Sequence, residues 1–174
     1  MVVRKRLTLE GPSMTFVTTT VKDWIPVFES EECAQIILTT FVDTLAQYQI
    51  ALAAYVLMPS HLHALLGFKR IEQMSEALQS FKSISSRRIK PSLSTELYNR
   101  FNECGKFQFG KPRFDDLIIW LETQFRVKMD YIHNNPGKNG LTEKSTDYLY
   151  SSARDWLSAE SGILPIEKNW KWLS

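Results

Sequence analysis

The chain has 174 residues, which is enough for one compact domain with its own core and short for two. Apolar residues make up 44% and charged residues 23%, and the longest apolar run, residues 50–58, is far below the ~20 residues that cross a bilayer. A net charge of +2 does not by itself indicate a polyanionic partner, and the two cysteines show neither metal-ligand spacing nor a disulfide framework. We therefore exclude membrane-spanning and disulfide-scaffold proteins and predict a cytoplasmic protein with a single domain over residues 1–174.

The first part of the chain alternates between strand and helix patterns. A basic arm over residues 1–13 precedes residues 14–21, whose β-branched side chains predict a strand. Ser30 is a suitable N-cap for a helix whose apolar positions recur at helical spacing up to residue 48. Residues 55–68 then predict two short apolar strands joined by a tight turn.

His61 and His63 open the second of these two strands. Side chains at positions i and i+2 of a strand project from the same face, so both imidazoles point to one side and Leu62 points to the other. Two neutral imidazoles side by side supply half of a divalent-metal site. A lone pair of this kind is more often two strand-end histidines exposed by chance, so a metal site needs a further ligand.

A helical pattern with an uneven charge distribution begins at Ile71. The segment 69–90 holds six basic and two acidic residues, and Lys82, Arg87 and Arg88 lie in its later half. Cations near the end of a helix are favoured by the helix dipole in any case, which makes a plain solvated face one explanation. Clustered Lys and Arg interleaved with Ser also suit contacts with a phosphate backbone, and the pattern leaves both explanations open.

Residues 91–118 show a less regular pattern, which favours a strand and a loop. Glycine and proline punctuate the segment 105–116, where aromatic and basic residues are interleaved. Lys106, Lys111 and Arg113 could neutralise a single strand of nucleic acid while the neighbouring phenylalanines stack on its bases. The same phenylalanines could equally belong to the core.

A long helix is predicted from residue 117 to about residue 135, where the Asn-Asn-Pro-Gly sequence ends it. Tyr131 and Asn135 are one turn apart on a face that differs from the apolar stripe, so a phenol and an amide oxygen are presented together. An amide oxygen is an acceptable ligand for Mg²⁺ or Mn²⁺. His133 lies about 200° around the helix from Tyr131, and we interpret it as structural. Residues 141–174 are expected to form a docked tail, with a short helix at residues 147–156 and with Trp170 and Trp172 packed on the body.

These segments resemble the single-tyrosine transposases of the histidine–hydrophobe–histidine (HUH) nuclease superfamily, and most closely their REP-associated branch. The matching segments are Phe16-Val-Thr, Tyr55-Val-Leu-Met-Pro-Ser-His-Leu-His, Phe107-Gln-Phe, Tyr131-Ile-His-Asn-Asn-Pro136 and Tyr148-Leu-Tyr-Ser-Ser-Ala-Arg154. They follow the order found in the family and cover nearly the whole chain. The residue before the first histidine is usually Asn in the family and is Ser60 here.

The resemblance implies an α+β fold of the ferredoxin-like kind, in which helices pack on one face of a central antiparallel sheet. It also implies that Tyr131 is the nucleophile. The metal ligands that it implies are His61, His63 and Asn135, with Mg²⁺ or Mn²⁺ as the ion. The expected substrate is single-stranded DNA with a REP-like hairpin, cut to a 5′-phosphotyrosine link and a free 3′-hydroxyl by a monomer or homodimer. The candidates for DNA contact are Lys82, Arg87, Arg88, Lys106, Lys111, Arg113 and Arg154.

Two other functions remain open on the sequence. The protein could be a catalytically inactive DNA-hairpin-binding protein, although the intact set of four residues argues against it. It could also be a metal-dependent phosphoesterase that uses water and leaves Tyr131 idle. That enzyme would retain most of its rate when Tyr131 is changed to Phe.

Overall fold

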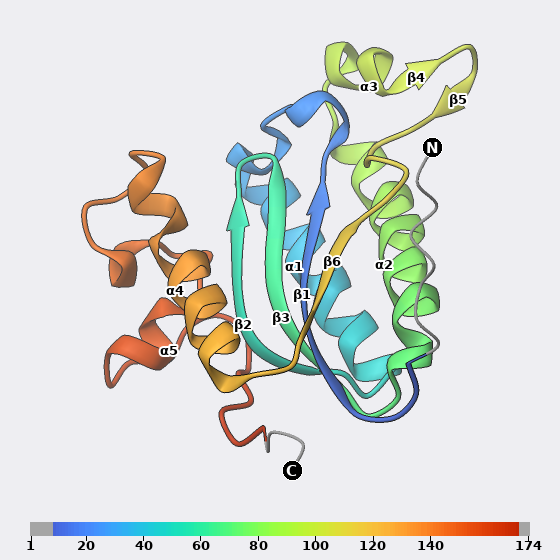
Figure 1. Ribbon diagram of the computed structural model, residues 1–174. Coiled ribbons are helices and arrows are strands. Elements are labelled where there is room, and N and C mark those ends of the chain that lie inside the picture. The colour runs from blue at the N-terminus through green and yellow to red at the C-terminus, as the bar shows by residue number, and fades with distance from the viewer. Residues whose placement is uncertain (1–8, 171–174) are drawn as a thin grey trace.

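The computed structural model describes residues 9–170 and shows an α+β fold, which confirms the predicted class. In chain order the elements are β1 (Ser13–Thr20), α1 (Glu31–Gln47), β2 (Ala51–Met58), β3 (His61–Phe68), α2 (Met74–Ile89), α3 (Thr95–Phe101), β4 (Asn102–Glu103), β5 (Lys106–Phe107), β6 (Asp115–Ile119), α4 (Glu122–Lys138) and α5 (Ala153–Leu157). Figure 1 shows β1, β2, β3 and β6 side by side at the centre of the molecule. No helix within residues 9–170 is both long enough and apolar enough to span a membrane.

The central sheet is antiparallel throughout, with the strand order β2-β3-β1-β6. β2 and β3 form the predicted hairpin, and seven of the eight residues in each strand are buried. β1 lies on the other side of β3, in a register that pairs Thr18 with His63 and Thr20 with His61. This register decides which side chains of β1 surround the histidine pair.

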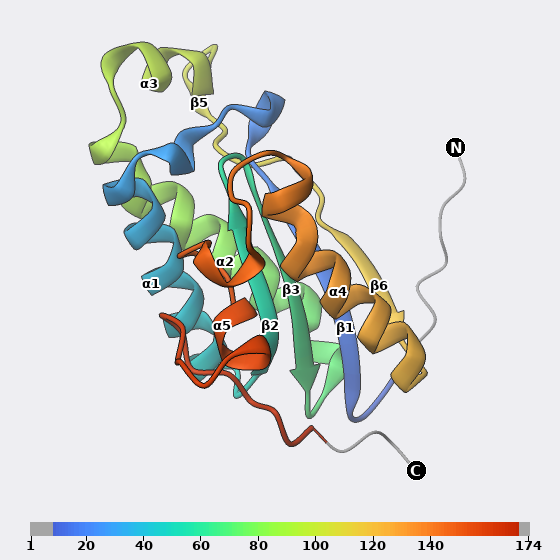
Figure 2. The same cartoon turned by 90° about the vertical axis from the view of Figure 1, so that its left-hand side faces the viewer.

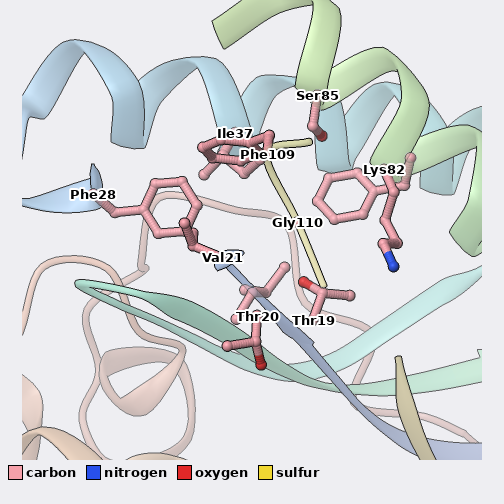
Figure 3. Close-up of a pocket in the computed structure, with 11 residues that line it drawn as sticks. Thr19, Thr20, Val21, Phe28, Ile37, Lys82, Ser85, Phe109 and Gly110 are labelled. Carbon is pink, nitrogen blue, oxygen red and sulfur yellow. The ribbon is translucent and has the colours of Figure 1, made fainter. Parts of the chain in front are cut away.

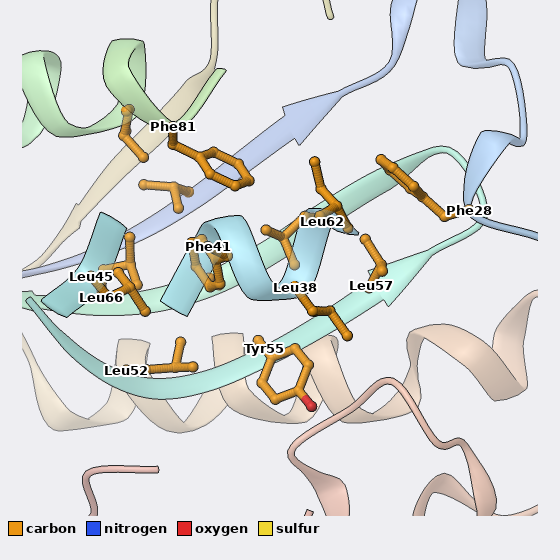
Figure 4. Close-up of a cluster of buried hydrophobic side chains, with 14 of the residues drawn as sticks. Phe28, Leu38, Phe41, Leu45, Leu52, Tyr55, Leu57, Leu62, Leu66 and Phe81 are labelled. Atoms are coloured by element: carbon orange, nitrogen blue, oxygen red, sulfur yellow. The ribbon is translucent and has the colours of Figure 1, made fainter. Parts of the chain in front are cut away.

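Helices cover both faces of the sheet. α1 and α2 pack on one face, where Phe41 and Phe81 meet with ring centroids 5.2 Å apart above Leu62 and Leu66 (Figure 4). α4 crosses the opposite face over β2 and β3, as Figure 2 shows, and buries Ile132 there. The expectation that helices pack on one face is therefore wrong for α4. β2 and β3 are apolar on both sides, so both sides need a covering layer.

The long helix starts later than predicted. Residues 117–119 belong to β6, where Leu117 pairs with Phe16, and α4 begins at Glu122. Its N-terminus is capped by the Gln124 side chain, whose oxygen accepts hydrogen bonds from the backbone N–H groups of Trp120 and Leu121. β6 is a half-exposed edge strand, so its apolar residues merged with the helical stripe in the sequence pattern.

The segment before α5 runs along the free edge of β2. Leu57 N donates to Tyr150 O over 2.8 Å, and Ser152 N donates to Tyr55 O over 3.0 Å. Unpaired edge groups of β2 are satisfied in this way, which protects the edge from pairing with another chain. Further along, the Trp170 ring packs so closely on Gly67 that a Cβ there would lie 2.5 Å from it. Trp172 and residues 1–8 of the expected basic arm lie outside the described residues.

Candidate active site

The two histidines lie together on the α4 side of the sheet. Their ring centroids are 4.6 Å apart, as the i, i+2 spacing predicted. The Thr18 hydroxyl is 2.7 Å from His63 Nδ1, and the Ser60 hydroxyl is 3.1 Å from His61 Nδ1. A hydroxyl that accepts Nδ1–H fixes the tautomer in which Nε2 carries the free lone pair. By accepting Nδ1–H, each hydroxyl can hold its imidazole in the form that binds a metal through Nε2.

Tyr131 reaches the same place from α4. Its hydroxyl oxygen lies 3.5 Å from His63 Nε2, and its ring meets the His63 ring edge-on at a centroid distance of 5.2 Å. Phe16 packs against both rings, at 5.5 Å from His63 and 5.9 Å from Tyr131. The site is open to solvent at Tyr131, because 39% of this residue is exposed. A large substrate can therefore reach the hydroxyl without a rearrangement of the core.

Burial and neighbouring cations keep the histidines neutral. Burial and, to a smaller extent, the positive charge of Lys111 lower the pKa of His61 to about 4. Burial also lowers the pKa of His63 to about 3, with smaller contributions from His61 and Lys128. Neutral imidazole is the form that ligates a metal, so the pair is ready to bind one at pH 7.

Lys128 is a residue of the site that the sequence analysis missed. Its ammonium nitrogen lies 4.6 Å from the centroid of the Phe16 ring and 5.5 Å from that of Tyr131. Lys128 is three positions before Tyr131, so the two share one face of α4. The same spacing argument that selected Asn135 could have found Lys128.

Asn135 lies one turn beyond Tyr131 and is 6% exposed. Its side-chain oxygen accepts a hydrogen bond of 2.9 Å from Asn139 Nδ2, which also donates to the Asn135 backbone oxygen. This contact orients the amide and leaves one lone pair of its oxygen free.

Within residues 9–170, no cluster of three His, Cys, Asp or Glu residues could hold a metal ion. A third protein ligand beside the histidines would thus have to be of another type, and an amide such as Asn135 suits Mg²⁺ or Mn²⁺. Two free imidazole nitrogens and one amide oxygen fit such an ion and would leave positions open for phosphate oxygens. The donor chemistry therefore agrees with the ligand set that the resemblance implies.

Among the predicted DNA-contact residues, Lys111 lies next to the histidine pair. Its ammonium nitrogen lies 4.3 Å from the centroid of the Trp24 ring, and this ring is 5.1 Å from the His61 ring. Lys82 contacts the same segment, because its ammonium donates a hydrogen bond to the Lys111 carbonyl. Figure 3 shows Lys82 beside Gly110, where a small, partly open pocket lies between α2 and the end of β1.

The other basic candidates lie elsewhere. Arg88 forms an ion pair of 2.6 Å with Asp43, and Arg154 Nε donates to the Thr146 carbonyl over 2.7 Å. The exposed candidates are Arg87 on α2, Lys106 on β5 and Arg113 in the loop before β6. Arg88 and Arg154 thus have structural partners within the chain, whereas the three exposed side chains are free to meet a ligand on the surface.

The profile of the IS200-like transposases matches residues 14–110, which is more than half of the chain. The chain belongs to this family. It is 29% identical over 115 residues to the REP-associated tyrosine transposase of Escherichia coli K12, an alignment that covers 66% of this chain and 59% of that protein. A solved structure of a REP-associated tyrosine transposase bound to a REP hairpin matches with a TM-score of 0.71 at 18% identity, covering 89% of this chain and 84% of that chain.

These comparisons confirm the predicted family and fold of this IS200-like transposase. The residues that match the family profile include the histidine pair and end before α4 begins. Tyr131 lies beyond the matched residues, and its place in the site rests on its contact with His63.

Proposed function

We propose that this IS200-like transposase cleaves single-stranded DNA by attack of Tyr131 on a phosphodiester. The proposal rests on one observation, the 3.5 Å between the solvent-accessible Tyr131 hydroxyl and His63 Nε2. At this distance from a potential metal ligand, the hydroxyl could attack the same phosphate that a bound ion would contact. With His61, His63 and Asn135 as ligands, Mg²⁺ or Mn²⁺ would polarise that phosphate.

The residues of the chain orient the reaction. Phe16 packs against the rings of His63 and Tyr131 and so fixes the direction of the phenol. Lys111 acts electrostatically on His61 and Lys128 on His63, so both charges are close enough to the site to attract a phosphate backbone. Attack forms a bond between Tyr131 Oη, which loses its proton, and phosphorus, and it breaks the bond from phosphorus to the 3′ oxygen, which takes up a proton. The products are a 5′-phosphotyrosine link and a free 3′-hydroxyl, and attack by another 3′-hydroxyl reverses the step and completes strand transfer.

We further propose that the substrate carries a REP-like hairpin. Support comes from the solved relative of the same fold, which is bound to a REP hairpin. The site also lies at the end of a sheet with its nucleophile exposed, so a flexible single strand can reach it more easily than a stacked duplex.

The test is incubation of labelled single-stranded DNA, carrying a hairpin from the flanks of the gene, with the protein and Mg²⁺ or Mn²⁺, followed by denaturing electrophoresis. We expect a metal-dependent covalent adduct that disappears in Tyr131→Phe and in His61→Ala. Tyr98→Phe is the matched control and should keep the adduct, because Tyr98 packs on Phe107 instead.

Two outcomes would replace the proposal. Hairpin binding without an adduct would indicate a catalytically inactive hairpin-binding protein. Cleavage that survives Tyr131→Phe would indicate a phosphoesterase that uses water.

A further inference from the structure

We propose that Trp24 is a stacking platform for a nucleobase next to the scissile phosphate, an inference that builds on the proposed function of the site. Trp24 lies in the turn after β1, and its ring centroid is 5.1 Å from that of His61. The residue is 52% exposed, so it is not a core residue. An aromatic surface open to solvent beside the reacting centre suits an unpaired base.

The backbone holds Trp24 in this position at a conformational cost. Asp23 and Trp24 both have a φ of 57°, in the left-handed region that bulky L-residues rarely adopt. Trp24 N donates to Val21 O over 3.1 Å, and Val21 and Ile25 on either side are buried. A further bond of 2.9 Å from Val21 N to Ser60 O ties the turn to the residue before His61. Strain that is retained at such a position is a sign of function.

Lys111 supplies the charge that a stacked nucleotide requires. Its ammonium nitrogen lies 4.3 Å from the Trp24 ring centroid, which is a cation–π contact. Its backbone N donates to Thr20 O over 2.8 Å, and Thr20 pairs with His61. The Lys111 backbone is thus fixed beside the site while its long side chain can move from the ring to a phosphate. An aromatic ring with an adjacent cation is the usual combination in proteins that bind single-stranded DNA.

The test measures DNA binding in the Tyr131→Phe background, so that cleavage does not interfere. The probe is a fluorescein-labelled single strand with the hairpin from the flanks of the gene, read by fluorescence anisotropy. Trp24→Asn removes the ring and keeps a residue that tolerates a positive φ. We expect it to weaken binding about tenfold or more, as the loss of one stacked base does. Trp24→Phe keeps an aromatic face and should restore most of the affinity.

Trp120→Asn is the matched control. Trp120 is 59% exposed and follows Ile119, which pairs with Met14 at the end of β1 remote from Thr20 and His61. Its substitution should leave the affinity for the probe unchanged.

A second measurement separates stacking from a general effect on the fold. Probes with a single abasic position are compared along the single-stranded flank. We expect one position at which removal of the base lowers the affinity of the original protein, which has Trp24, about tenfold. The same removal should hardly change the affinity of the Trp24→Asn variant. Equal affinities of the Trp24 protein and the variant for the intact probe would overturn the inference. The inference would also be overturned if Trp24→Asn bound more weakly than the original protein to every probe, whichever position lacks its base.

The two proposals can fail separately. If the Trp24 protein with Tyr131 intact forms the covalent adduct but no abasic position couples to Trp24, the stacking inference alone is wrong. If one position couples to Trp24 but no adduct forms, Trp24 still binds a base and the cleavage proposal is wrong.

Discussion

Thr18 connects the strand register to the chemistry of His63. The register places its hydroxyl 2.7 Å from His63 Nδ1, where it can accept Nδ1–H and so orient the ring with Nε2 free. Thr18→Val removes this hydroxyl and keeps the shape of the side chain. We expect the affinity for Mn²⁺ to fall about 10- to 100-fold, the usual effect of losing such a partner of a ligating histidine. Isothermal titration calorimetry with Mn²⁺ measures this directly.

Thr19→Val is the control for that experiment. Thr19 is the next residue on β1 and pairs with Leu62, so its side chain points to the α1 and α2 face. It should leave Mn²⁺ binding unchanged. An unchanged affinity in Thr18→Val as well would show that the hydroxyl does not support a metal ligand.

Local periodicity explains which site residues the sequence revealed. His61 and His63 are two apart on a strand, and Tyr131 is fixed on one face of a helix, so each could be found from spacing alone. Thr18 and Trp24 come to the histidines from β1 and the turn after it, through a strand register that a single sequence does not contain. Their contribution became visible only when the pairing of β1 with β3 was known.

At the scale of elements, Ser152 joins the C-terminal segment to both β2 and α4. Its hydroxyl accepts a hydrogen bond of 2.9 Å from Tyr55 N and lies 2.9 Å from His133 Nε2. All three residues are buried. Ser152→Ala leaves the Tyr55 N–H and the His133 ring without this partner. We expect the free energy of unfolding to fall by about 2–3 kcal/mol, since each unsatisfied buried group costs about 1–3 kcal/mol. Urea unfolding measures the change.

Ser158→Ala provides the comparison in the same segment. Ser158 is exposed and its hydroxyl donates to the Arg154 carbonyl over 2.9 Å, so water can replace the bond. Its loss should change the unfolding free energy by less than about 0.5 kcal/mol. If Ser152→Ala were equally mild, the segment would not be held to β2 by this hydroxyl.

Element types were harder to predict where tertiary contacts decide them. The sequence predicts a short helix around residues 147–156, but residues 150–152 form backbone hydrogen bonds with the edge of β2 and the α-helix is confined to Ala153–Leu157. The predicted helix after residue 117 likewise begins as the edge strand β6. In both segments the backbone forms hydrogen bonds with the edge of a sheet. The local sequence pattern does not show where such an edge will lie. Elements with a cap and a full apolar stripe, such as α1 with Ser30, were predicted well.

At the scale of the whole molecule, a polar site lies between a layered core and an outer helix. α1 and α2 cover one face of β3, and α4 covers the other and carries Tyr131 to the histidines. Because β3 is buried from both sides, the imidazoles lose water while the phenol keeps it. On the α4 face of the sheet, the proposed metal ligands are thus embedded in β3 while the proposed nucleophile lies on the outer helix, and the two meet different environments.

The same burial makes the stability of the whole molecule sensitive to acid. The pKa values of His61, His63 and His133 are all lowered, chiefly by burial. A proton therefore binds the unfolded chain more tightly than the folded one. Stability from these residues is complete above the ordinary histidine pKa of about 6.5 and is lost as the pH falls toward the folded values.

His133 allows this effect to be isolated, because it is 3% exposed and its pKa is lowered to about 4 even though Asp130 and Asp155 act to raise it. The amide of Gln in His133→Gln can donate to Ser152 in place of Nε2 and does not titrate. We expect the variant to gain on the order of 3 kcal/mol relative to the original protein between pH 7 and pH 4. Urea unfolding across this range measures the difference. A difference that stays constant with pH would mean that the pKa of His133 is the same in the folded and the unfolded protein.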